Sequence, residues 1–177
     1  MEQRLSTFSY GKGGEESIMN YFKRFGYVVC DKSDDAFYRE KDIDMVISKG
    51  DKSYSVEVKT DTRAKTTGNI IVERMMERVQ GTRRGWFYFC EADILCYYLE
   101  NAQKAYFLDW CKIKALILSG KAVNCRFINP IDPNCIGYGW LLSIEQLLRP
   151  NHVILWESNI MPLEFSKNVG DANTCKR

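Results

Sequence analysis

The chain has 177 residues, of which 45% are hydrophobic and 27% charged, and its formal net charge is +2. This composition fits one globular domain with a core and excludes a wholly disordered chain, a collagen-like repeat and a coiled coil. No apolar run approaches the roughly 18 residues of a membrane-spanning helix, and the first residues lack the apolar stretch of a signal peptide. We therefore expect a cytoplasmic protein with no membrane partner.

The histidine and cysteine content excludes several catalytic and metal-binding classes. His152 is the single histidine, so a two-histidine HExxH metalloprotease site is impossible, and we expect His152 to be incidental. Seven cysteines are present without a Cys-x-x-Cys pair, which argues against structural zinc. Because the count is odd and no secretory signal is present, we expect reduced thiols, several of them in the core.

The chain begins with an amphipathic helix, expected from about residue 14 to residue 25. Gly26 ends it, and a short strand at 27–30 and a polar loop at 31–41 follow. The apolar stripe of the helix repeats at spacings of three and four, which is the helical period, and consists of Ile18, Tyr21, Phe22 and Phe25.

Two strands at 43–47 and 54–59 flank a turn that contains Gly50, which predicts a β-hairpin. A basic, Thr-rich loop is expected at 60–68, and extended structure resumes at 69–73. The segment 74–84 carries four arginines in eleven residues.

Further strands are expected at 86–90, 94–99 and 105–108, followed by a helix at 109–118 with Asp109 near its N-cap. Prolines and glycines predict a long loop at 124–139. The later elements expected are a short helix at 143–148 with a Ser143/Gln146 capping box, an edge strand at 153–156 and a frayed tail at 167–177.

The hairpin carries the chemically informative residues. Side chains alternate between the faces of a strand, so Asp42 and Asp44 share one face, and Glu57 and Lys59 share the corresponding face of the next strand. Two carboxylates held close together repel unless a cation lies between them, and Mg²⁺ is a hard cation that takes one or two protein carboxylates. Lys59 would then stabilise negative charge on a phosphate. A half-exposed hairpin without any catalytic role shows the same alternation, so that alternative stays open.

A carboxylate at the start of the first helix, Glu15, precedes the Asp, Glu and Lys of the hairpin. In this order the chain resembles the PD-(D/E)xK nuclease superfamily over about residues 11–61. Gly14-Glu15, Tyr21-Phe22 and Gly26-Tyr27 look like its "GE…YL…GY" segment. Its "IDLI" and "VEVKT" strands are similar to residues 43–46 and 56–60, and the 13-residue step from Asp44 to Glu57 is similar to that in small resolvase-like members.

The resemblance implies an α/β fold, with a restriction-endonuclease-like mixed central sheet flanked by helices. It implies a metal-dependent nuclease that hydrolyses phosphodiester bonds with Mg²⁺, or alternatively Mn²⁺, acting on DNA in preference to RNA. Asp44 and Glu57 would be the metal ligands, Lys59 the catalytic base or electrostatic helper, and Glu15 an accessory carboxylate. The alternative is a nuclease-fold protein that has lost turnover and binds nucleic acid or a protein partner. An unrelated α/β scaffold and a homodimer that cuts both strands also stay open.

Several further residues are secondary candidates. Glu16 is the immediate rival of Glu15, and Asp42 stands where such proteins often carry another acid. The chain departs from the family where many members place a helix with a basic or Gln residue directly after the Glu-x-Lys strand. Arg74, Arg78 and Gln80 are candidates for that position. Glu73 is a further polar candidate that would face the site.

Basic residues flank the proposed site and are candidates for contacting nucleic-acid phosphates. Trp86 follows Arg83-Arg84-Gly85 and is expected to begin a buried strand rather than to stack on a base. The candidate phosphate-binding residues are Lys12, Arg63, Lys65, Arg74, Arg78, Arg83 and Arg84.

For domain organisation we expect a nuclease-like core at residues 1–120, a C-terminal extension packed on it at 121–166, and a flexible tail at 167–177.

Overall fold

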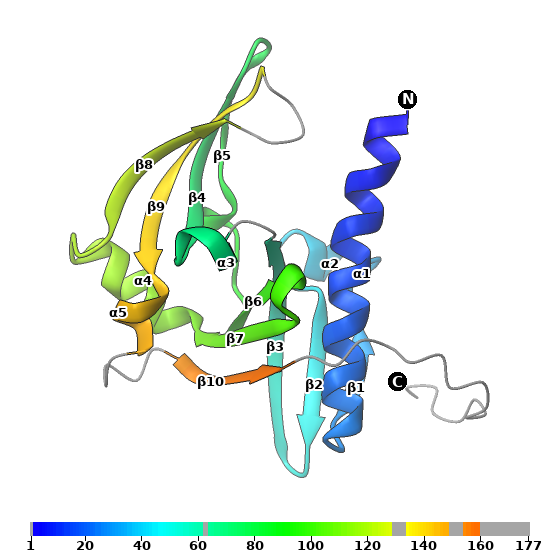
Figure 1. Cartoon of the computed structure of the whole chain (residues 1–177). Helices are drawn as coiled ribbons and strands as arrows, with labels where there is room; N and C mark the ends of the chain where they lie inside the picture. The colour runs from blue at the N-terminus through cyan, green and yellow to red at the C-terminus, as the bar shows by residue number, and fades with distance from the viewer. Residues whose placement is uncertain (1, 62–63, 129–133, 149–153, 160–177) are drawn as a thin grey trace.

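Two β-sheets, with one long helix covering the first, make up the protein (Figure 1). This computed structural model describes residues 2–61, 64–128, 134–148 and 154–159. The expected tail at 167–177, His152 and Arg63 therefore lie outside the described residues. Within the described part, no helix is long and apolar enough to span a bilayer.

The first sheet has six strands, in the order β1-β2-β3-β6-β7-β10. Strands β3 and β6 are parallel, and every other neighbouring pair is antiparallel. The predicted hairpin is confirmed as β2 and β3, and β3 lies near the centre of the sheet. The strands are β1 (Val28–Asp31), β2 (Met45–Lys49), β3 (Lys52–Asp61), β6 (Ile94–Leu99), β7 (Lys104–Asp109) and β10 (Ile154–Asn159).

The second sheet is antiparallel, in the order β5-β4-β9-β8. It overturns the expected loop at 124–139, because most of that segment is strand. Its glycines serve close packing rather than turns: a Cβ on Gly137 would lie 2.1 Å from the Phe127 ring, and one on Gly139 would lie 2.4 Å from the Val72 carbonyl oxygen. The strands are β4 (Asn69–Arg78), β5 (Gly81–Arg84), β8 (Val123–Ile128) and β9 (Ile136–Ser143).

The helix α1 (Glu2–Arg24) packs against β1 and β3 and begins twelve residues earlier than expected. Gly14 lets it approach β3 closely, since a Cβ there would lie 1.9 Å from Thr60 Oγ1. The apolar stripe is confirmed at Ile18 and Phe22, which are fully buried, whereas Phe25 is 56% exposed beyond the end of the helix.

Shorter helices occupy the connections, and some correct the sequence-based expectations. The predicted strand at 86–90 is a 3-10 helix, and the expected loops at 31–41 and 60–68 each contain one helical turn. The helix after β7 is confirmed with Asp109 as N-cap, whose side chain accepts a hydrogen bond from the Lys112 N–H. The helices are α2 (Ala36–Arg39), α3 (Ala64–Thr67), η1 (Trp86–Tyr88), η2 (Glu100–Ala102), α4 (Trp110–Leu118) and α5 (Ile144–Leu148).

The first sheet separates two hydrophobic clusters. Met45, Val56 and Val58 pack with Ile18 and Phe22 of α1 on one side. On the other side, residues of β6 and β7 pack with α4 and the second sheet. All six residues of β6 are buried, so this strand has apolar neighbours on both faces, as central parallel strands do.

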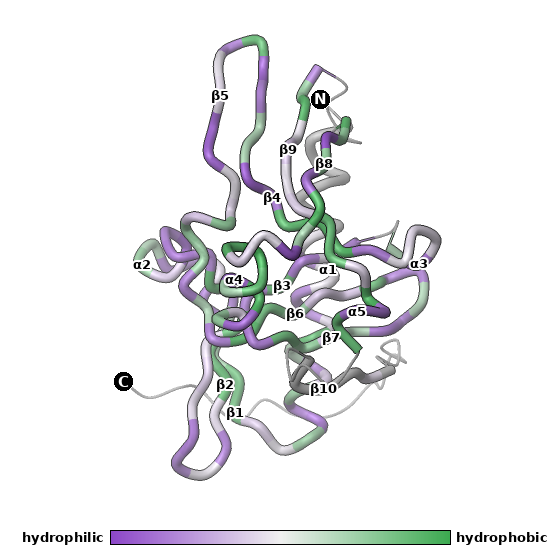
Figure 2. Tube along the Cα trace, turned by 90° about the vertical axis from the view of Figure 1, so that its left-hand side faces the viewer, coloured by the Kyte–Doolittle hydropathy of each residue, from purple (hydrophilic) through white to green (hydrophobic). Residues whose placement is uncertain are grey.

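Two hairpin ends lie at opposite extremes of the molecule. The β4–β5 hairpin forms one end and the β2–β3 turn the other, with the hydrophobic body between them (Figures 1 and 2). Strands β8 and β9 continue the second sheet beyond β4, whereas β10 pairs with β7 at the edge of the first sheet. The division of the chain at residue 120 stays a prediction.

Five of the described cysteines are free thiols, and three of these are buried. Cys30, however, is disulfide-bonded, so the prediction of reduced thiols is wrong at this position.

Candidate active site

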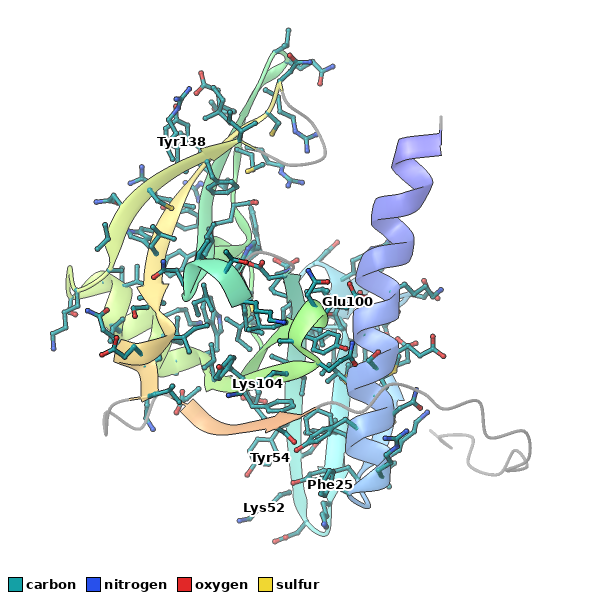
Figure 3. The ribbon with its side chains drawn as sticks, in the orientation of Figure 1. Phe25, Lys52, Tyr54, Glu100, Lys104 and Tyr138 are labelled. Carbon is teal, nitrogen blue, oxygen red and sulfur yellow. The ribbon has the colours of Figure 1, made fainter. Side chains whose placement is uncertain are left out.

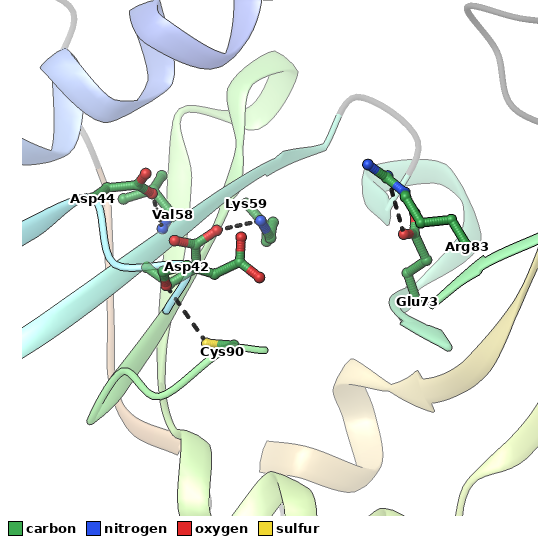
Figure 4. A network of polar contacts seen from close by, with 8 residues as sticks. Asp42, Asp44, Val58, Lys59, Glu73, Arg83 and Cys90 are labelled. Atoms are coloured by element: carbon green, nitrogen blue, oxygen red, sulfur yellow. Dashed lines mark hydrogen bonds and ion pairs between the residues drawn. The ribbon is translucent and has the colours of Figure 1, made fainter. Parts of the chain in front are cut away.

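Asp44 is held at the start of β2 by two hydrogen bonds to β3. Its N–H donates to the Val56 carbonyl at 3.0 Å, and its Oδ2 accepts the Val58 N–H at 2.7 Å (Figure 4). The strand pairing therefore fixes both the backbone and the carboxylate of Asp44 against β3, beside Glu57.

Glu57 is the one buried polar or charged residue among those described, and it is 3% exposed. Because Val56 and Val58 pack toward α1, Glu57 and Lys59 lie on the opposite side of β3. Glu57 Oε1 accepts a hydrogen bond from Lys59 Nζ, while its Oε2 is buried without a partner. A buried carboxylate with an unpaired oxygen is costly, so this position calls for a proton or a cation.

The carboxyl groups of Glu57 and Asp44 both have raised pKa values, chiefly because both are buried. Burial raises the pKa of Glu57 well above its usual value, with Lys59 opposing and Asp44 adding to the rise. Burial likewise raises the pKa of Asp44, which the Val58 N–H and Lys59 partly oppose. A cation bound between these groups would relieve both effects.

Lys59 is the cation that the chain itself supplies. Burial alone would lower its pKa, but Glu57, Asp44 and Asp42 together raise the pKa above the usual lysine value. Its Nζ lies 5.2 Å from the centroid of the Trp86 ring. Trp86 therefore shields Lys59 from one side, and the expectation that it begins a buried strand is wrong.

Asp42 reaches the same cluster by a different backbone route from the one expected. It lies before β2 with a φ of 46°, a left-handed conformation that Asp tolerates better than most residues. The alternation argument for Asp42 therefore fails, because the strand begins only at Met45. Burial raises the pKa of Asp42, and Lys59 opposes the rise, so the carboxylate still lies within electrostatic range of Lys59.

Glu15, rather than Glu16, faces the site. Glu15 lines a cleft of about 350 Å³ together with Asp44, Lys12 and Arg39, whereas Glu16 is exposed. Burial raises the pKa of Glu15 to about 7, with Asp44 adding to the rise. Arg39 is a lining residue that the sequence analysis missed; the charged composition of 31–41 was the available signal.

The second sheet brings Glu73 and Arg83 toward the same site. Arg83 Nη2 lies 4.0 Å from Glu73 Oε1 (Figure 4). Burial raises the pKa of Glu73, and Arg83 and Lys59 both oppose the rise. A β-bulge between Glu73 and Met75 alters the register of β4 at this point.

The other candidate residues are dispersed. Arg74 lies over the Trp140 ring, and Arg84 over Tyr88. Lys65 lies on α3 and contacts the Asn101 carbonyl at 3.4 Å. The remaining two, Arg78 and Gln80, are exposed near the tip of the β4–β5 hairpin.

The carboxylate oxygens of the candidate site are ligands of the kind that a hard divalent cation prefers. Within the described residues, no three His, Cys, Asp or Glu side chains are grouped to hold a metal ion. Mg²⁺ requires fewer protein ligands, because it keeps several waters and uses one or two carboxylates. Asp44 and the unpaired oxygen of Glu57 meet that requirement.

Comparison with known proteins supports the fold. No family model matches the sequence, and no curated protein matches it. Among solved structures the chain is similar to the bacterial homing endonuclease I-Ssp6803I, with a TM-score of 0.50 and 16% sequence identity. The similarity covers 62% of this chain and 73% of that chain. The predicted mixed central sheet flanked by helices is thus confirmed, and its arrangement is similar to that of this endonuclease.

Proposed function

We propose that this protein is a metal-dependent nuclease of the PD-(D/E)xK type that hydrolyses phosphodiester bonds in DNA. The observation that carries the proposal is the buried set of Asp44, Glu57 and Lys59 on adjoining strands, with Glu57 Oε2 unpaired. Folding alone gains nothing from burying two like charges, so the arrangement favours a functional role. The likeness to a homing endonuclease supports DNA as the substrate.

In this proposal Asp44 and Glu57 hold Mg²⁺, with Mn²⁺ as a substitute. The bound ion would supply activation of water and stabilisation of charge on the departing oxygen. The chain's own residues do the rest: the Val58 N–H orients Asp44, and Trp86 shields Lys59. In the metal-free protein the neighbouring carboxylates raise the pKa of Lys59, so it keeps its positive charge throughout the physiological range. We therefore assign Lys59 to electrostatic stabilisation of the phosphate rather than to proton abstraction.

Glu15 is assigned as an accessory carboxylate at the cleft. Its raised pKa of about 7 leaves it partly protonated near neutrality, so it can exchange a proton with water in the cleft. Lys12 and Arg39 line the same cleft and provide positive charge for a phosphate.

Cleavage assays test the proposal directly. Plasmid, linear duplex, single-stranded DNA and RNA are incubated with Mg²⁺, Mn²⁺ or EDTA, using wild type, Glu57→Gln and Lys59→Met. We expect metal-dependent cutting of DNA, with loss of roughly 100- to 1,000-fold in Lys59→Met. The matched control pair is Glu15→Gln and Glu16→Gln, of which only the first should slow cutting.

A binding measurement separates a nuclease from an inactive relative. Calorimetric titration with Mn²⁺ should show binding to wild type and none to Asp44→Asn, with circular dichroism confirming that both are folded. A folded wild type that binds no divalent ion and cuts no substrate would exclude the nuclease. A gel shift on the same DNA would then test the alternative, a nuclease-fold protein that binds nucleic acid without turnover.

A further inference from the structure

The tip of the β4–β5 hairpin exposes side chains that contribute nothing to the hydrophobic core. Every residue from 77 to 84 is exposed, and Val79 is 90% exposed, more than any other large hydrophobic residue described. The segment carries three arginines and one glutamate. An apolar side chain and a basic cluster at one projecting end are features of a surface that contacts a polyanion.

The strand register places two of the arginines on one face. Met76 pairs with Arg83, and Arg78 pairs with Gly81, so Arg78 and Arg83 lie on the same side of the hairpin. This side faces the candidate active site, because Arg83 lies 4.0 Å from Glu73. The hairpin and the catalytic carboxylates therefore approach a substrate from the same side of the molecule.

The end of the hairpin carries side chains that suit one groove of B-form DNA. β4 pairs with β5 on one side and with β9 on the other as far as Glu77 and Ile136, so among the described strands only the end of the hairpin, from Arg78 to Gly81, extends beyond the sheet as a two-stranded ribbon. The major groove, about 12 Å wide, admits such a ribbon, whereas the minor groove, about 6 Å wide, is too narrow. Arg and Gln side chains recognise G and A edges there, and an apolar side chain contacts the thymine methyl.

We propose that the β4–β5 hairpin enters the major groove of duplex DNA and reads bases there through Arg78, Val79 and Gln80, with Arg83 at its base. The part of the proposal that links this contact to strand cutting rests on the proposed nuclease function. Groove recognition itself does not.

Fluorescence anisotropy with a 30-base-pair duplex of random sequence tests the groove contact. Ca²⁺ replaces Mg²⁺ to suppress cutting. A second duplex carries glucosylated 5-hydroxymethylcytosine, which fills the major groove, and netropsin is added separately to occupy the minor groove. Variants are Arg78→Ala and Gln80→Ala, with Lys52→Ala as control, because Lys52 is exposed at the opposite end of the molecule from Tyr138 and the second sheet (Figure 3).

We expect glucosylation to weaken wild-type binding at least tenfold and netropsin to leave it unchanged. Arg78→Ala should weaken binding roughly 5- to 100-fold if it contacts a base, or reduce the salt slope by about 1 if it contacts a phosphate. Gln80→Ala should change the ranking of defined sequences, and Lys52→Ala should match wild type.

Each contrary result has a definite meaning. The hairpin proposal would be overturned by equal binding to the glucosylated duplex or by competition from netropsin. It would also be overturned by equal effects of Arg78→Ala and Lys52→Ala, or by the absence of duplex binding. Cleavage in Mg²⁺ is measured in parallel. Cutting without groove dependence rejects the hairpin and retains the nuclease, while groove-dependent binding without cutting rejects the nuclease and supports the hairpin.

Discussion

Replacing Lys59 with methionine should destabilise the metal-free protein, and it should do so more at pH 8 than at pH 5. Lys59 is the ion-pair partner of Glu57, whose side chain is 4% exposed. Without Lys59, the Glu57 carboxylate is left buried beside Asp44 and must either remain charged at high cost or take up a proton.

The magnitude follows from burial and proton linkage. Removing one partner of a buried ion pair costs roughly 3–5 kcal/mol, and because the Lys59 side chain is 28% exposed we expect about 3 kcal/mol at pH 8. The folded-state pKa of Glu57 is already raised by burial, and loss of Lys59 raises it further. Because the variant's Glu57 takes up a proton at a higher pH than the wild-type residue does, the cost falls as the pH is lowered, by at most about 1.4 kcal/mol per pH unit.

Urea unfolding in EDTA at the two pH values measures the effect. About 3 kcal/mol corresponds to roughly 6–12 °C in melting temperature for a chain of this size. Lys52→Met is the control for loss of an exposed lysine, and adding Glu57→Gln to Lys59→Met should restore most of the loss at pH 8. An equal cost at both pH values, or no restoration in the double variant, would refute the reasoning.

Three further changes test other parts of the structure. Gly14→Ala should destabilise the protein by about 1–3 kcal/mol in chemical unfolding, because its Cβ would collide with Thr60. Gly13→Ala is the control: its Cβ would have nothing within 4 Å, so it should stabilise the helix by about 0.5–1 kcal/mol. Similar effects at both positions would contradict the close packing of Gly14 on β3. The pKa of Glu15 is raised to about 7, so its contribution to stability is complete below about 4.5 and is lost as pH rises through 7. Glu15→Gln should therefore lose less stability than wild type between pH 5 and pH 8, and parallel stability–pH curves would count against it. Trp110→Phe removes buried surface and the hydrogen bond from the indole N–H to the Cys90 carbonyl. It should therefore lower the free energy of unfolding by about 2–3 kcal/mol, measured in urea. A change below about 0.5 kcal/mol would show that this side chain is not part of the core.

The local elements with strong periodic patterns were predictable. The alternation of apolar and charged residues in 43–47 and 54–59 correctly indicated the β2–β3 hairpin, because one face of each strand is buried. Asp109 followed by an apolar helical segment correctly indicated the N-cap of α4.

The second sheet was not predictable from local pattern. Segment 124–139 carries glycines and prolines that normally indicate a loop, but Gly137 and Gly139 admit a ring and a backbone carbonyl at close range. Trp86 lies in a residue run of strand-forming character, and its packing against Trp110 and Lys59 favours a 3-10 turn instead.

The sequence by itself determined the central hairpin and the order of Glu15, Asp44, Glu57 and Lys59, because these depend on period and spacing along the chain. Tertiary structure alone decided that Glu15 rather than Glu16 reaches the cleft, since the helix rotation is set by Ile18 and Phe22 packing on the sheet. It also brought the second sheet, with Glu73 and Arg83, beside the carboxylates. Such contacts join residues far apart in the chain, and they are selected by burial and close packing rather than by any local preference.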